Sequence, residues 1–113
     1  MGFIANFKAG RAMTKMVNLM EEVESNRKTA DEGYGSHLSE ARQVQVEAEI
    51  IESMNYLRRF PRHVVTENLL KNMRIASKFG DNKRIMASSN VLEILVEEGV
   101  ALDLDTFEKS YLR

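Results

Sequence analysis

Two helical patterns that meet at a glycine–aspartate pair constrain the fold more than any other feature of this sequence. Residues 65–96 carry apolar side chains at helical spacing on both sides of Gly80-Asp81, and the first pattern places Phe79 on its apolar arc. A glycine at this position can adopt the left-handed backbone conformation that ends one helix, and the aspartate carboxylate can cap the free amides of the next helix. The second pattern is apolar around so much of its circumference that it needs neighbours on two sides. The sequence therefore predicts a helical hairpin whose second helix lies in the core.

The rest of the chain predicts an all-α fold, a small antiparallel bundle or array of αα-hairpins. The residue before Pro61 is disfavoured in a helix, so a helix ends there and another begins. Ser36 is the expected cap of the helix before Pro61, and Asp105 is the expected cap of a short final helix. Short connections predict that successive helices are antiparallel neighbours. The predicted helices comprise residues 3–28, 36–60, 62–79, 82–98 and 106–112.

The predicted helix 36–60 is apolar on two sides. One side carries Val44, Ala48 and Ile51, and the other carries Val46, Ile50, Met54 and Leu57. Because a solvent-facing helix shows one apolar stripe, two stripes indicate that this helix also lies between two neighbours.

Length and composition favour one small intracellular domain. A chain of 113 residues suits a single helical domain, with residues 1–28 as a helix that could separate and 29–36 as a linker. The absence of cysteine excludes disulfides and thiolate chemistry. No apolar run approaches the roughly 20 residues that span a bilayer, and no secretory signal is recognisable. We therefore expect a cytoplasmic location.

No pattern in the sequence indicates catalysis. His37 and His63 lie outside any zinc-protease or di-iron motif. Paired carboxylates such as Glu49 and Glu52 fall on a predicted solvent face, where acid–base chemistry has no buried site. No serine has a nucleophile elbow around it. The sequence therefore predicts no catalytic residue, no bound metal, no cofactor and no enzyme activity.

An apolar stripe of methionine and phenylalanine on the N-terminal helix is the first candidate binding surface. Methionine side chains adapt their shape to different partners. Three alternatives remain open: the stripe packs onto its own bundle, it pairs with a second copy in a homodimer, or residues 1–20 lie on an anionic membrane. The stripe comprises Phe3, Phe7, Met13, Met16 and Met20.

A basic helix face is the second candidate binding surface. Residues 58–84 contain eight bases and two acids, although the whole chain has a net charge of −1. Such a face can neutralise nucleic-acid phosphates, but it can also meet the acidic helix 36–57 or an acidic patch of a partner, which we favour. The face comprises Arg58, Arg59, Arg62, Lys71, Arg74 and Lys78.

The turns at Phe60-Pro61, Gly80-Asp81 and Gly99 resemble those of tetratricopeptide-type helical hairpins. The spacing from Pro61 to Gly80 is about two residues longer than in that family, Ile85 stands at the family's usual alanine position, and no 34-residue repeat is present. The resemblance implies a hairpin architecture and no activity. The sequence therefore predicts a non-enzymatic protein–protein interaction domain, acting as an adaptor, a regulator or a self-assembling subunit. The alternatives are a nucleic-acid-associated regulator and a peripheral membrane protein.

Overall fold

The computed structural model describes residues 3–31 and 39–111, with side chains placed for 7–26 and 39–111. All regular structure in these ranges is helical, as predicted. The helices are α1 (Phe3–Asp31), α2 (Glu40–Leu57), α3 (Arg62–Lys78), α4 (Asn82–Glu97) and α5 (Leu104–Tyr111). Four of them pack as the main bundle, and the short α5 lies against α3.

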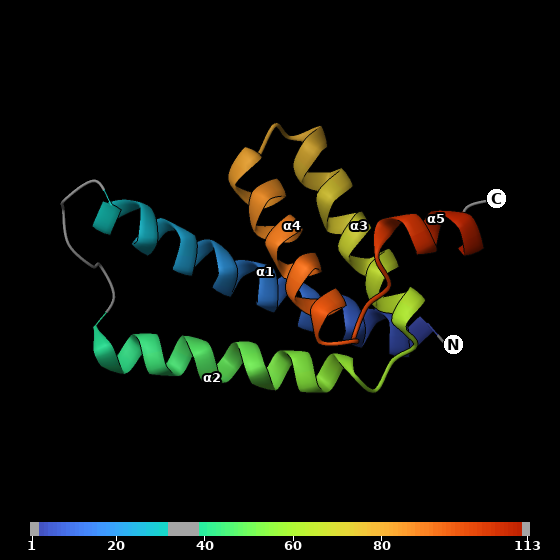
Figure 1. Cartoon of the computed structure of the whole chain (residues 1–113), viewed down its shortest axis with the longest axis horizontal. Coiled ribbons are helices and arrows are strands. Elements are labelled where there is room, and N and C mark those ends of the chain that lie inside the picture. Colours follow the sequence, from blue (N-terminus) through green and yellow to red (C-terminus); the bar gives the residue numbers. More distant parts are fainter. Residues whose placement is uncertain (1–2, 32–38, 112–113) are drawn as a thin grey trace.

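Helix α1 is the centre of the molecule. It packs against α2 on one side and against the α3–α4 hairpin on the other, as Figure 1 shows. Its 29 residues span about 44 Å at 1.5 Å per residue, which matches the longest dimension of 47 Å. The N-terminal helix is therefore an integral part of the bundle.

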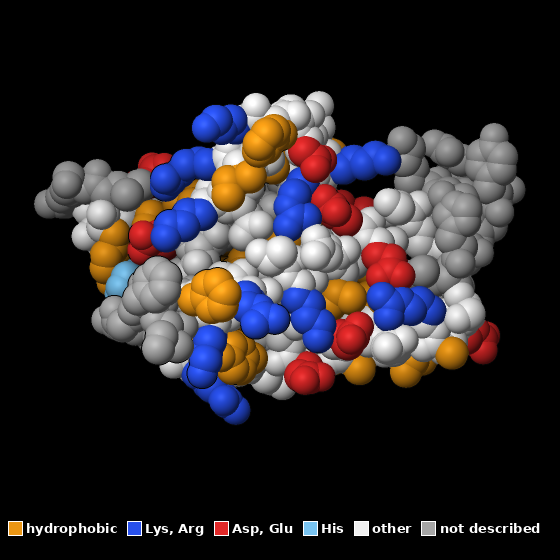
Figure 2. Space-filling view, turned by 180° about the vertical axis from the view of Figure 1, so that it is seen from behind, with side chains coloured by type: hydrophobic (Ala, Val, Ile, Leu, Met, Phe, Trp, Pro, Cys, Tyr) orange, Lys and Arg blue, Asp and Glu red, His pale blue; other side chains and the backbone are white. Residues whose placement is uncertain are grey.

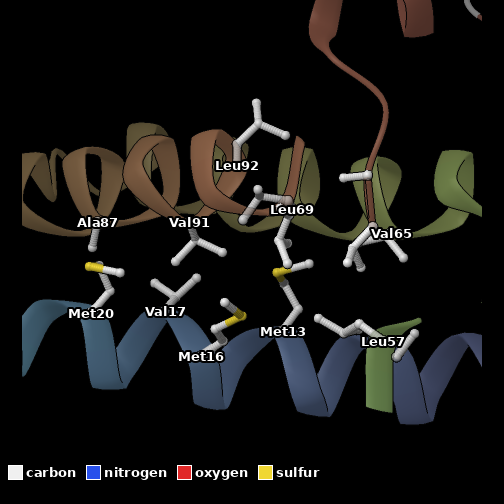
Figure 3. Close-up of a cluster of buried hydrophobic side chains, with 14 residues drawn as sticks. Met13, Met16, Val17, Met20, Leu57, Val65, Leu69, Ala87, Val91 and Leu92 are labelled. Atoms are coloured by element: carbon white, nitrogen blue, oxygen red, sulfur yellow. The ribbon is translucent and has the colours of Figure 1, made fainter. Parts of the chain in front are cut away.

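The core lies where α1 meets the hairpin. Met13, Met16 and Val17 of α1 are completely buried and point toward α3 and α4 (Figure 3). Across this contact, Leu69 lies beside Met13, and Ala87 lies opposite Met20. Helix α4 thus has α1 and α3 as neighbours, which confirms that it needs two.

Gly10 in the middle of α1 allows α3 to approach closely. A Cβ atom at this position would lie 3.2 Å from Oδ1 of Asn68. The Asn68 amide is itself held in place, because its Nδ2 donates to the carbonyl of Val64 at 2.9 Å. A glycine that weakens an isolated helix therefore serves the packing of two helices here.

The turn chemistry at the ends of α3 and α4 follows the prediction. Gly80 and Gly99 adopt φ values of 68° and 71°, the left-handed conformation that glycine takes without a steric penalty. The Asp81 carboxylate caps α4 by accepting from the amide of Arg84 at 3.0 Å. However, Phe79 does not join the apolar arc of α3: at the C-cap its side chain is 79% exposed, so this part of the prediction is wrong.

Several predicted helix ends differ from the structure; among them, α2 ends at Leu57, three residues before the predicted end at residue 60. Helix α1 continues to Asp31, three residues into the predicted linker, and the rest of that linker and Ser36 lie outside the described residues. Ser39 caps α2 by accepting from the amide of Arg42 at 3.1 Å. Asp103, and not Asp105, caps α5 by accepting from the amide of Thr106 at 2.8 Å, which lowers the pKa of the Asp103 carboxyl.

A corner at Phe60-Pro61 separates α2 from α3. The short connection predicted two antiparallel neighbours, but α3 turns away from α2 and crosses the opposite side of α1 (Figure 1). Among the described residues, α1 is therefore the one helix that packs extensively against α2. The expectation of two neighbours for α2 is wrong, because the hairpin covers α1 instead.

A buried threonine joins the segment before α5 to α3. The Thr66 hydroxyl accepts from the amide of Leu102 at 2.9 Å and donates to the carbonyl of the same residue at 2.8 Å. Phe107 of α5 is buried, and Tyr111 stacks on His63 with ring centroids 4.5 Å apart. These contacts dock the C-terminal helix onto α3.

Candidate functional site

The outer face of α2 carries an apolar stripe that no other part of the described chain covers. Val44 is 67% exposed and Ile51 is 53% exposed, and the small residues Ala41 and Ala48 lie on the same side. Figure 2 shows hydrophobic side chains along the lower edge of the molecule, where α2 runs. We call this surface the outer α2 stripe; it comprises Ala41, Val44, Ala48 and Ile51.

The opposite face of α2 fixes the orientation of the stripe. Val46, Ser53 and Leu57 are buried against α1, and at 100° per residue they project roughly 140–180° away from Ala48. Packing this face against α1 necessarily turns the second apolar side of α2 outward. The stripe is thus a consequence of how α2 docks.

Ion pairs hold α2 on α1 along the flank of the helix. The Arg42 guanidinium donates to both carboxylate oxygens of Glu22, with distances of 2.9 and 2.7 Å. Glu49 lies 3.7 Å from Arg42 and 3.8 Å from Lys15. The hydrogen bonds from Arg42 lower the pKa of the Glu22 carboxyl, and Glu22 in turn raises the pKa of Arg42. This network is directed at α1 and leaves the outer α2 stripe uncovered.

Charges are distributed unequally along α2. The exposed Glu40 and Glu47 lie in its N-terminal half, whereas Arg58 and Arg59 lie at its C-terminal end. The Arg58 guanidinium contacts Glu98, donating to its carbonyl at 3.0 Å and to its carboxylate at 3.3 Å. Arg59 lies over the ring of Tyr56 at 5.4 Å. The exposed Glu52 also lies beside Ile51 in the C-terminal half. The stripe therefore has Glu40 before its first residue, two arginines after its last residue and one further carboxylate along its edge.

The three methionines of the α1 stripe lie inside the chain's own bundle. Met13 and Met16 are fully buried, and Met20 is nearly so. These three side chains follow the first of the three alternatives, in which the stripe packs onto its own bundle. Phe7 departs from the stripe and is exposed, with Arg11 6.0 Å from its ring centroid. The side chain of Phe3 lies outside those described.

The predicted basic face does not form one surface over the acidic helix. Arg58 and Arg59 follow the last turn of α2. The other members of the face, beginning with Arg62, lie on α3, which does not pack on α2. Lys71 pairs within α3 with Glu67, at 4.0 Å. Arg74 and Lys78 are exposed, and neither forms an ion pair with any described residue. Within the described part of the chain, the expected balance between this face and the acidic residues of α2 is therefore not found.

A second exposed apolar pair lies at the end of α3. Ile75 and Phe79 are one helical turn apart and both project into solvent. Figure 2 shows hydrophobic side chains at this end of the hairpin with lysine and arginine side chains around them. We call this surface the α3 end patch; it comprises Ile75 and Phe79 with Lys71, Arg74 and Lys78.

Two shallow hollows border α2. One, of about 400 Å³, lies between α1, α2 and α4, with Met20 and Val46 among its apolar lining and Glu24, Glu47 and Glu93 among its acidic lining. The other, of about 550 Å³, includes Ala48 and Ile51 of the outer α2 stripe. The second hollow therefore widens the uncovered surface of α2 toward α1.

Chemistry-bearing side chains are dispersed over the described part of the chain. No group of three or more histidine, aspartate or glutamate residues placed there could hold a metal ion. None of the described helices is long and apolar enough to cross a bilayer. Comparisons of the chain with protein-family models, with curated proteins and with solved structures found no match.

Proposed function

We propose that this chain is a non-enzymatic protein–protein interaction domain and that the outer α2 stripe is its contact surface. The observation that supports the proposal is the exposure of Val44 and Ile51 on a helix whose opposite face already packs against α1. Single exposed apolar side chains are normal on protein surfaces, but a stripe at helical spacing is a recurring mode of recognition between helices.

The energetic argument rests on desolvation of the stripe. Complete burial of one valine or isoleucine side chain is worth about 1.5–3 kcal/mol relative to leaving it exposed. The small side chains of Ala41 and Ala48 in the same stripe let another helix approach closely, so a partner helix would cover all four residues at once. The surface suits an apolar helix as the partner.

Affinity capture with a matched pair of variants tests the proposal. The double variant Val44→Gln/Ile51→Gln removes most of the apolar area of the stripe and keeps residues that favour a helix. Met86→Gln removes a comparably exposed apolar side chain from α4, outside both named surfaces, and serves as the control. We expect proteins from native lysate, or an untagged copy of the chain, to be retained by the wild type and by the control and lost from the double variant. Identical capture by all three would contradict the proposal.

The α3 end patch supports a second candidate function, contact with an anionic membrane surface. Two large apolar side chains at a protruding helix end, next to three cations, resemble the composition of surfaces that insert shallowly into the headgroup region. Co-sedimentation with vesicles that contain phosphatidylserine, lost in Phe79→Glu, would support it. Binding to single-stranded RNA without binding to vesicles would favour the nucleic-acid alternative, in which the cations contact phosphates.

A further inference from the structure

We infer that the outer α2 stripe binds the same stripe of a second copy of this chain, with the two α2 helices antiparallel about a two-fold axis beside Ala48. This inference rests on the proposed function and names its partner. It follows from the spacing of apolar and charged residues along α2.

The apolar residues of the stripe match each other when one α2 is reversed. Val44 lies four positions before Ala48, and Ile51 lies three positions after it. A two-fold axis beside Ala48 therefore brings Val44 within about 1.5 Å, measured along the helix, of the partner's Ile51. Ala48 meets the partner's Ala48, and its small side chain permits close approach of the two backbones. An isologous contact of this kind needs one self-complementary surface.

The charged ends of α2 also match in this arrangement. Glu40 and Arg58 are 18 positions apart, which is five turns, so both project from the same flank of the helix. Arg58 keeps helical dihedral angles at the C-cap, with φ −60° and ψ −17°. Around the same axis, Glu40 lies about 3 Å along the helix from the partner's Arg58. The contact of Arg58 with Glu98 leaves other guanidinium N–H groups for a second carboxylate.

The charges select the antiparallel orientation. In a parallel pair, Glu40 would lie at the opposite end of the interface from the partner's Arg58, so neither attractive contact could form. The antiparallel pair contains two attractive Glu40–Arg58 contacts, one at each end of the stripe. Each exposed contact contributes up to about 1 kcal/mol at low salt, so the charges set orientation while the apolar residues supply most of the attraction.

Charge reversal of the full chain, followed by sedimentation equilibrium at low salt, tests the inference. Each copy buries one face of an 18-residue helix, about 27 Å long, so the interface is small and the concentration series should reach on the order of 1 mM. We expect the wild type to dimerise. Glu40→Arg alone and Arg58→Glu alone should each weaken the dimer about tenfold, because two attractive contacts become repulsive.

An equimolar mixture of the two variants gives the decisive measurement. In the mixed dimer, the guanidinium introduced by Glu40→Arg in one chain faces the carboxylate introduced by Arg58→Glu in the other. At the opposite end of the stripe, the native Arg58 of the first chain faces the native Glu40 of the second. The mixture should therefore recover the wild-type association. Glu98→Gln serves as the folding control, because it removes the ion pair of Arg58 within the chain and should leave the dimer intact.

Three results would overturn the inference. The first is a wild type that stays monomeric at about 1 mM, the top of the concentration series that a small interface requires. The second is a single variant that associates as strongly as the wild type. The third is a mixture of the two variants that fails to recover association. A monomeric wild type whose capture of another protein still depends on Val44 and Ile51 would overturn the inference and leave the proposed function standing. Loss of both behaviours would overturn both.

Discussion

Thr66 shows how a single buried hydroxyl secures the end of this chain. Its Oγ1 satisfies the amide and the carbonyl of Leu102, and the residue is completely buried. Because a buried polar group without a partner is costly, Thr66→Val should lower the free energy of unfolding by about 1–3 kcal/mol although its side chain has the same shape. Urea denaturation followed by circular dichroism measures this change. Thr66→Ser keeps the hydroxyl, so its free energy of unfolding should be closer to that of the wild type than the free energy of the valine variant is.

The ion pair between Glu22 and Arg42 makes the stability of the bundle depend on pH. The hydrogen bonds from Arg42 hold the pKa of Glu22 in the folded chain below its ordinary value of 4.5. A carboxyl with a lowered pKa stabilises the fold while it is ionised, and this contribution is lost as the pH falls from 4.5 through the folded pKa.

Thermal unfolding of the wild type and Glu22→Gln between about pH 7 and about pH 3 measures that contribution. The wild type should be the more stable protein above pH 4.5, and the two curves should converge toward the acidic end of the range. A difference that stays constant over this range would contradict the role of the ionised carboxylate.

At the scale of elements, the left-handed glycines decide where α3 and α4 end. Gly99 has φ +71° and open space around its Cβ position, so a substitution there acts through backbone strain and not through a clash. Gly99→Ala should therefore lower the free energy of unfolding by about 1–2 kcal/mol. Glu97→Ala, two residues earlier in exposed helix, provides the comparison and should change it by less than about 0.5 kcal/mol. Equal stability of the two variants would contradict the argument.

At the scale of the whole molecule, burial distinguishes residues that hold the monomer together from residues that are free to bind. Met16 is fully buried between the helices, whereas Ile51 is 53% exposed. Met16→Glu places an unpaired charge in the core and should lower the free energy of unfolding by at least about 3 kcal/mol. Ile51→Glu should change it by no more than about 0.5 kcal/mol.

Light scattering separates the two effects. Ile51→Glu should shift the mass of the concentrated protein toward that of a monomer while the helical content stays unchanged. The Met16→Glu variant should instead lose its cooperative unfolding transition, because its fold is destabilised. A folded Met16→Glu variant with reduced self-association would instead place the interface on α1.

The sequence determined which segments are helical and where the hairpin turns. Apolar spacing, the glycine at each turn and the cap at Asp81 act within a few residues along the chain, so they could be predicted without knowledge of the packing. Two apolar sides were visible on the segment that forms α2, and Val44, Ala48 and Ile51 were assigned to one of them. The sequence did not indicate which side would remain exposed.

Only the tertiary structure decided which apolar surfaces are buried. Periodicity describes a helix without its neighbours, and burial depends on which helices meet. The corner at Phe60-Pro61 sends α3 and α4 across the far side of α1, so Met13, Met16 and Met20 become core and α2 keeps one neighbour. The same choice turns Val44 and Ile51 of α2 outward. The candidate binding surface therefore arises because α1 can cover only one face of α2.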